Sequence, residues 1–180
     1  MFSAVKRMFL VAEERKIPNI PAMSNLLPPR PDVGDAPPGT YAIVASQFNA
    51  QYVDALLENA RAELTAISPR STVAVHRAPG SFEIPLLVQS VATSAKPDAI
   101  IALGLIIDGE TAHARLIADA VTRSLLDISL QHGIPVIHEV LLVANEDQAR
   151  RRCLESDLNR GIEAARAAVA ASLSLKSLTN

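Results

Sequence analysis

The chain has 180 residues, of which 49% are apolar, and its 17 basic and 19 acidic side chains leave a formal net charge of −2. The apolar content is enough for one domain with a core, and the charge balance excludes the basic stripe of a nucleic-acid-binding protein. The single cysteine, Cys153, excludes an internal disulfide framework and a cysteine-rich metal site. Because no apolar run approaches the roughly 20 residues of a membrane span, we expect a soluble, cytoplasmic protein with neither nucleic acid nor a membrane as partner.

Prolines are concentrated at the start of the chain, where seven of the twelve lie within the first 38 residues. Proline fixes φ and lacks an amide proton, so residues 27–31 cannot form a helix or a central strand. We therefore expect residues 1–38 to form a flexible Pro-rich arm, residues 39–175 the folded domain, and residues 176–180 a short tail.

From residue 41 onward, short apolar runs alternate with amphipathic stretches. Runs of strand length cover residues 41–45, 72–75, 99–107 and 136–143. Helical periodicity covers residues 53–66, 84–95, 114–132, 146–153 and 160–173. The run 99–107 has almost no polar alternation, which is typical of a strand buried on both faces of a parallel sheet. The order predicts a three-layer α/β/α sandwich around a four-stranded parallel sheet.

Open parallel sheets bind ligands at the carboxyl ends of their strands, so we expect ligand-binding residues at the strand-to-helix junctions. Phe48 and Asn49 follow the first strand and supply an aromatic ring and an amide. After the second strand, Gly80 permits an unusual backbone conformation and Ser81 is placed to cap the next helix. Glu83 then falls in the first helical turn, where the helix dipole favours an anion. This junction fits either a ligand site or a plain helix entry.

The third junction carries the strongest candidate for proton transfer. Thr111 and His113 follow a glycine turn, and histidine is the side chain whose pKa lies nearest neutrality. A histidine with only a structural role in a first turn fits the same pattern. Asp108, Glu110 and His113 also offer hard metal ligands, but no established metal-site spacing is present.

Positive charge gathers near the end of the chain, in Arg150–Arg152 and again at Arg160. Such a run forms either a solvated helix face or a guanidinium fork that binds an anion such as phosphate. The residues alone therefore indicate a small-molecule enzyme whose substrate carries an anion.

Several of these motifs occur together in one family. Phe48-Asn49, the segment PGSFEIP at 79–85, the pattern G-x-T-x-H at 109–113 and the triplet NRG at 159–161 resemble the lumazine synthase family. The resemblance runs from about residue 41 to residue 171. It implies the flavodoxin-like α/β/α fold of the lumazine synthase type.

The resemblance also implies a reaction and an assembly. Members of the family are transferases of riboflavin biosynthesis that condense 5-amino-6-(D-ribitylamino)uracil with 3,4-dihydroxy-2-butanone 4-phosphate, without a cofactor or a metal. They form pentamers, which pair as decamers or close into icosahedral shells. Each site lies between adjacent subunits of the pentamer.

Carried over by position, the resemblance implies that His113 is the acid–base residue and that Arg152 binds the substrate phosphate. The implied substrate-binding residues are Phe48, Asn49, Gly80, Ser81, Phe82, Glu83, Ile106, Ile107, Glu110, Thr111, His138, Arg152 and Arg160. Of these, Phe48 would stack on the pyrimidine, and Ser81 and Glu83 would bind the ribityl chain. The neighbouring subunit would supply His138, Arg152 and Arg160.

Three residues depart from the family pattern. Asp108 stands where many members have a basic residue, Glu110 lies inside the presumed phosphate loop, and His138 replaces a common phenylalanine. These departures leave open a catalytically weak or inactive paralogue that binds flavin or lumazine as an oligomeric assembly. A metal-dependent aldolase or dehydratase is the third possibility.

Overall fold

The computed structural model describes residues 27–34 and 37–179. The elements, in chain order, are β1 (Thr40–Ser46), α1 (Ala50–Ile67), β2 (Thr72–Ala78), the short 3₁₀ helix η2 (Ser81–Glu83), α2 (Ile84–Ser94), β3 (Ala99–Ile107), α3 (His113–His132), β4 (Val136–Val143), α4 (Glu146–Cys153) and α5 (Arg160–Thr179). Every helix and strand predicted from the sequence is present. α1 begins three residues earlier than predicted, because Asn49 turns the chain in a left-handed conformation with φ of 57°.

The four strands form one parallel sheet in the order β2-β1-β3-β4. β3 lies inside the sheet, and its first eight residues are all buried, which confirms the prediction from its continuous apolar run. From β1 the chain first moves to one side, to β2, and then to the other side, to β3. The carboxyl ends of β1 and β3 therefore flank the point where the strand order reverses.

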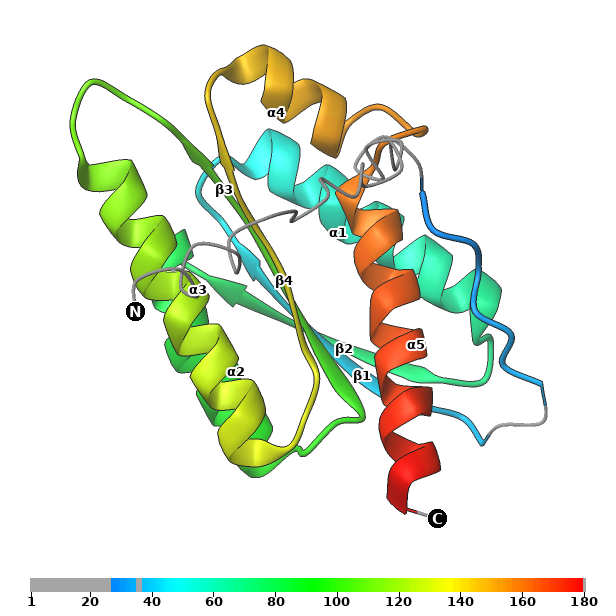
Figure 1. The fold of residues 1–180 in the computed structure, drawn as a ribbon. Coiled ribbons are helices and arrows are strands. Elements are labelled where there is room, and N and C mark those ends of the chain that lie inside the picture. The colour runs from blue at the N-terminus through cyan, green and yellow to red at the C-terminus, as the bar shows by residue number, and fades with distance from the viewer. Residues whose placement is uncertain (1–26, 35–36, 180) are drawn as a thin grey trace, which may run out of the picture.

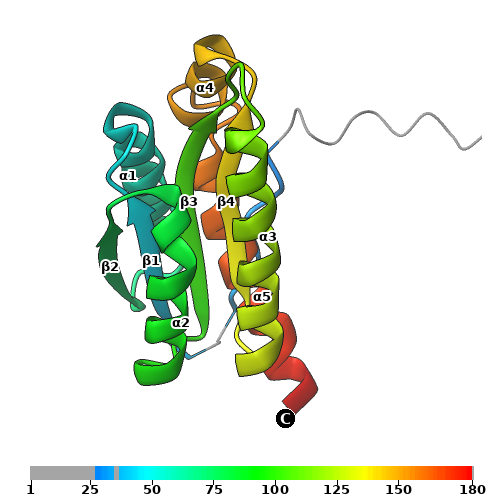
Figure 2. The same cartoon turned by 90° about the vertical axis from the view of Figure 1, so that its left-hand side faces the viewer.

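Helices cover both faces of the sheet, and Figure 1 shows the sheet running between the two layers. Alternate residues of β1 point to opposite faces. Ala42 and Val44 pack towards α2 and α3, which lie in front of the sheet in Figure 2. Ile43 and Ala45 pack towards α1, α4 and α5. The predicted three-layer α/β/α sandwich is thus confirmed.

The expected flexible arm, residues 1–38, lies largely outside the described residues. Its part 27–34 is held by a buried carboxylate on α1. Arg30 donates two hydrogen bonds of 2.9 Å to Glu63, and Arg166 of α5 donates another of 2.7 Å to the same side chain. Hydrogen bonding from Arg30 is the main reason that the pKa of Glu63 lies below its usual range.

The chain end also differs from expectation, because α5 continues through most of the expected tail to Thr179. The residues after 173 include neither proline nor glycine, so nothing in the local sequence ends the helix. Among the described residues, no helix is both long and apolar enough to cross a membrane.

The start of α5 lies unusually close to α1. A Cβ atom added to Gly161 would lie 2.2 Å from the carbonyl oxygen of Leu56. Asn159, which is fully buried, holds this junction by accepting a 2.9 Å hydrogen bond from the Gly161 N–H and donating one of 2.6 Å to the carbonyl of Cys153. The glycine of the NRG triplet is therefore required by helix packing.

We predict that Gly161→Ala lowers the free energy of unfolding by about 1–3 kcal/mol, since the added methyl group must push the two helices apart. Denaturant unfolding followed by circular dichroism measures this change. Gly109→Ala is the control, because no atom lies within 4 Å of a Cβ added there. Equal stability of the two variants would contradict the packing argument.

Candidate active site

A cleft of about 540 Å³ opens at the carboxyl ends of β1 and β3, beside η2 and the start of α3. It is lined by Phe48, Asn49, Gly80, Ser81, Phe82, Glu83, Leu105, Ile106, Ile107, Gly109, Thr111, His113, Ala114 and Ile117. Its position is the one at which open parallel sheets bind ligands. The fold thus brings together side chains from three strand-to-helix junctions that are far apart in the sequence.

Most of the site residues predicted from the sequence line this cleft. Those that do are Phe48, Asn49, Gly80, Ser81, Phe82, Glu83, Ile106, Ile107, Thr111 and His113. Four others lie elsewhere: Glu110, His138, Arg152 and Arg160. The cleft of one chain therefore holds the expected ring-binding, polyol-binding and acid–base groups, but none of the expected guanidinium groups.

The junction after β1 is fixed by the side chain of Asn49. Its amide nitrogen donates a 2.9 Å hydrogen bond to the carbonyl oxygen of Leu105, at the end of β3. The N–H of the preceding residue, Phe48, donates to Ser46 Oγ at 3.0 Å. The Phe48 ring is 67% exposed, so it offers an apolar surface on which a planar ligand can stack.

Ser81 presents an unpaired hydroxyl beside the cleft. The side chain packs over Gly104 of β3, where an added Cβ would lie 2.9 Å from Ser81 Oγ. The residue is 8% exposed, and its Oγ has no hydrogen-bond partner among the described residues. The expectation that Ser81 caps α2 is wrong, because no side chain caps that helix and the residue at its N-cap position is Glu83. A buried hydroxyl without a partner is costly, and a polyol ligand would satisfy it.

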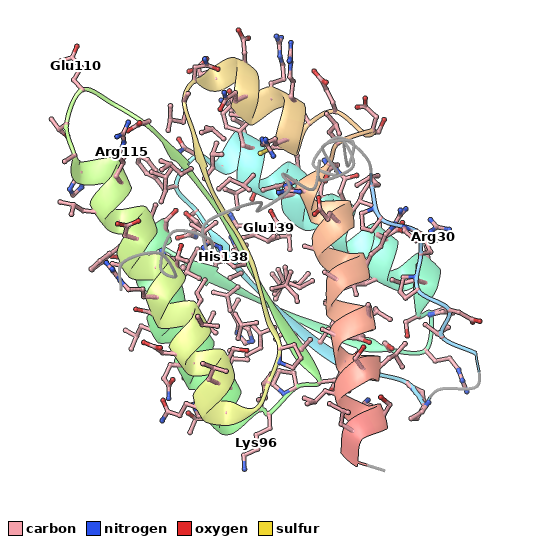
Figure 3. All side chains as sticks on the ribbon, viewed as in Figure 1. Arg30, Lys96, Glu110, Arg115, His138 and Glu139 are labelled. Carbon is pink, nitrogen blue, oxygen red and sulfur yellow. The ribbon has the colours of Figure 1, made fainter. Side chains whose placement is uncertain are left out.

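His113 is the first residue of α3 and is exposed to solvent. Its backbone N–H donates to Thr111 Oγ1 at 3.4 Å, which joins the helix start to the β3–α3 loop. The imidazole is thus open to a ligand in the cleft. Glu110, in contrast, is exposed, and Figure 3 shows its side chain pointing away from the molecule.

The sequence analysis missed a cation at this loop. Arg115 donates two hydrogen bonds, of 3.2 and 3.0 Å, to the same carboxylate oxygen of Asp108. This Asp108–Arg115 pair joins the end of β3 to the first turn of α3 and spans the loop that carries Thr111 and His113. The pair is formally neutral, so Arg115 cancels the negative charge that Asp108 adds to the loop.

The Asp108–Arg115 pair also bears on the metal hypothesis. Asp108, one of the three proposed ligands, is engaged by a guanidinium, and Glu110 points outward. Within residues 27–34 and 37–179, no group of three or more histidine, cysteine or acidic side chains is arranged to hold a metal ion. The geometry therefore favours these residues as groups that fix the conformation of the loop and not as metal ligands.

We predict that Asp108→Asn and Arg115→Gln each weaken binding of the phosphorylated substrate, seen as a rise in KM of about twofold to fivefold, because either change breaks the pair that holds the loop. This is the size expected for an exposed ion pair. The double variant should raise KM little more than either single variant does, since the second change removes a group whose partner is already lost. Steady-state kinetics of the wild type, the two single variants and the double variant form a double-mutant cycle. If KM in the double variant rises by the product of the two single-variant factors, the pairing role is ruled out.

The His138 side chain lies on the face of β4 that packs against α3. Its Nε2 lies 2.8 Å from Thr122 Oγ1, and its Nδ1 accepts a 3.1 Å hydrogen bond from the N–H of Val140. Because Thr122 Oγ1 donates to the carbonyl of Ala118, it must accept from His138 Nε2–H, which assigns the neutral tautomer. Burial lowers the pKa of His138. The ring is thus neutral and engaged by α3 in the single chain.

Arg152 and Arg160 lie together on the α4–α5 side of β4, in what we call the charge cluster, with Glu139 and Glu163. Arg160 Nε lies 3.5 Å from a carboxylate oxygen of Glu139, and Arg160 also pairs with Glu163. Burial, together with the charge of Glu139, raises the pKa of the neighbouring Cys153 thiol to about 12. That thiol is therefore inert near neutral pH.

An open parallel sheet with a cleft of this composition at its carboxyl edge defines an α/β protein that binds small molecules. The family model of 6,7-dimethyl-8-ribityllumazine synthase matches residues 39–176. Curated relatives from Xanthomonas euvesicatoria pv. vesicatoria (strain 85-10) and Xanthomonas axonopodis pv. citri (strain 306), both named 6,7-dimethyl-8-ribityllumazine synthase, are 40% identical over 139 residues, which cover 76% of this chain and 90% of the relative. The chain belongs to the 6,7-dimethyl-8-ribityllumazine synthase family, as the sequence motifs predicted.

Proposed function

We propose that this chain condenses 5-amino-6-(D-ribitylamino)uracil with 3,4-dihydroxy-2-butanone 4-phosphate to form 6,7-dimethyl-8-ribityllumazine, in the cytoplasm. The observation that carries the proposal is the cleft itself, which unites the Phe48 ring, the unpaired Ser81 hydroxyl and the His113 imidazole within the segment that matches the family. The family match and the names of the relatives support the same transferase of riboflavin biosynthesis.

Catalysis in this site rests on positioning and on one proton shuttle. Phe48 would stack on the pyrimidine, the backbone of Ile106 and Ile107 would read its edge, and Ser81 and Glu83 would hold the ribityl chain. Holding two substrates in register makes a bimolecular step effectively unimolecular. His113 would move protons as the imine forms and phosphate leaves. The sequence resemblance implies no cofactor for these steps.

The single chain lacks one part of this site, because its cleft contains no guanidinium to bind phosphate. Arg152 belongs to α4, Arg160 to α5 and His138 to β4, and none of them lines the cleft. A second copy of the chain would bring these groups to the cleft, as in the pentamers implied by the resemblance. Large apolar side chains on the surface of α3 support such a contact, since Leu116, Leu126 and Leu130 are 59–74% exposed.

A non-catalytic binding assembly is the alternative suggested by Asp108, Glu110 and His138, which depart from the family pattern. Two of these departures support it less strongly once the side chains are placed. Arg115 neutralises Asp108, and the Glu110 carboxylate points away from the cleft. We therefore favour the active enzyme over a binding assembly.

We expect His113→Ala to lower kcat for lumazine formation by about tenfold to 100-fold, because it removes the proton shuttle but leaves the binding groups in place. Absorbance of the lumazine product, followed after both substrates are mixed, measures the rate. His76→Ala is the control, since His76 lies on β2 and outside the cleft. Unchanged kinetics in His113→Ala would remove the histidine from the mechanism, and an inactive wild type would refute the proposed reaction.

A shared site makes a second prediction, about mixed assemblies. His113→Ala and Arg152→Ala subunits should each assemble into weakly active rings. When the two are unfolded and refolded together, about a quarter of the sites regain both groups, because those sites combine the intact half of each subunit. Activity of the mixture, with mass measurement in solution, is the test. A monomeric mass, or a mixture no more active than its components, would contradict the shared site.

A further inference from the structure

Glu139 of β4 carries a carboxylate in an unusual setting. The residue is 8% exposed, and its side chain lies on the face of β4 that α4 and α5 cover. Its nearest cation is Arg160, with 3.5 Å between Arg160 Nε and a Glu139 oxygen. That Nε is buried and makes no hydrogen bond within the described part of the chain, whereas another nitrogen of Arg160 donates to Glu163. Figure 3 labels Glu139 on the strand between the two helix layers.

The charged groups around Glu139 cancel the charge of one another when Glu139 is ionised. α5 contributes Arg160 and Glu163, and α4 contributes Arg152 together with the inert thiol of Cys153. The β3 partner of Glu139 in the sheet is the apolar Leu103. On the other face of β4, the ring of His138 contacts α3. Two guanidinium groups are therefore offset by two carboxylates when Glu139 is ionised, and by one when it is protonated.

We propose that Glu139 is a positioning residue for Arg160: as a carboxylate it holds the guanidinium against β4, and as a neutral acid it leaves the guanidinium available to a dianionic phosphoryl or sulfuryl group. The inference rests on the proposed function, in which a second copy of the chain brings Arg160 to the cleft. It adds a residue that the sequence motifs do not single out. Three observations support it: the burial of Glu139, the loose 3.5 Å contact, and the competing carboxylate of Glu163.

The protonation state of the Glu139 carboxyl group determines how the affinity for an anion depends on pH. Burial raises the pKa of Glu139 to about 7, although the charge of Arg160 acts in the opposite direction. Below this pH the group is neutral, and the charge cluster carries one net positive charge. Above it, the carboxylate cancels that charge and binds Arg160. Anion affinity should thus fall as pH rises through neutrality, and a bound anion should in turn raise the pKa of Glu139.

Sulfate is a suitable probe because it remains a dianion between pH 6 and pH 8, whereas phosphate titrates there. We expect calorimetry on the intact protein to give an affinity for sulfate about fivefold to tenfold higher at pH 6 than at pH 8. Glu139→Gln, which copies the neutral acid in shape and charge, should bind sulfate at both pH values as the wild type does at pH 6. Glu155→Gln, an exposed carboxylate on the surface after α4, should keep the wild-type pH dependence.

A second measurement uses the wild type alone, in case the Gln variant folds poorly. Sulfate binding near pH 7 should take up protons, seen as a binding enthalpy that varies with the ionisation enthalpy of the buffer. Arg160→Ala should abolish that uptake. An identical pH dependence in wild type and Glu139→Gln, or no proton uptake by wild type, would overturn the role of Glu139. Since sulfate binding needs no turnover, this result is separate from absence of lumazine formation, which would instead refute the proposed function.

Discussion

The hydrogen bond from Asn49 to the carbonyl of Leu105 is the contact on which the site depends most directly. It joins the ends of β1 and β3 at 2.9 Å, at the point where the chain leaves the sheet in opposite directions. Gly104 lies beside it and leaves the space that Ser81 occupies. The carboxyl ends of parallel strands lie at one edge of the sheet. The Phe48 ring, the Ser81 hydroxyl and the His113 imidazole therefore surround a common cleft, although the three residues are far apart in the sequence.

The fold could be predicted almost completely from the sequence, and the cleft could be predicted in large part. The unbroken apolar run of β3 indicated a parallel sheet, and single glycines marked the ends of β2 and β3. The Asp108–Arg115 pair could not be predicted, because the path of the intervening loop decides whether the two side chains meet. Ser81 looked like a helix cap, whereas in the structure it packs over Gly104. The local pattern of residue types identifies helices and strands well. Contacts between side chains on either side of a loop depend on the conformation of that loop, which the pattern does not specify.

Arginine is the cation at each partly buried carboxylate discussed above. Glu63 receives Arg30 and Arg166, Asp108 receives Arg115, and Glu139 receives Arg160. A guanidinium remains charged at any physiological pH and offers several donors in one plane, so it can satisfy two acceptors at once. Sequence analysis could locate these arginines but not their partners. The partners of Glu63 and Glu139 lie on other segments of the chain, which only the tertiary structure brings into contact.

His138 has a consequence for how copies of the chain can meet. β4 is a terminal strand of the described sheet, and such strands tend to recruit further strands through unpaired backbone amides. Here the imidazole accepts the amide proton of Val140, so that donor is already occupied by a side chain of its own strand. Extension of the sheet into a second molecule is thereby discouraged at this position.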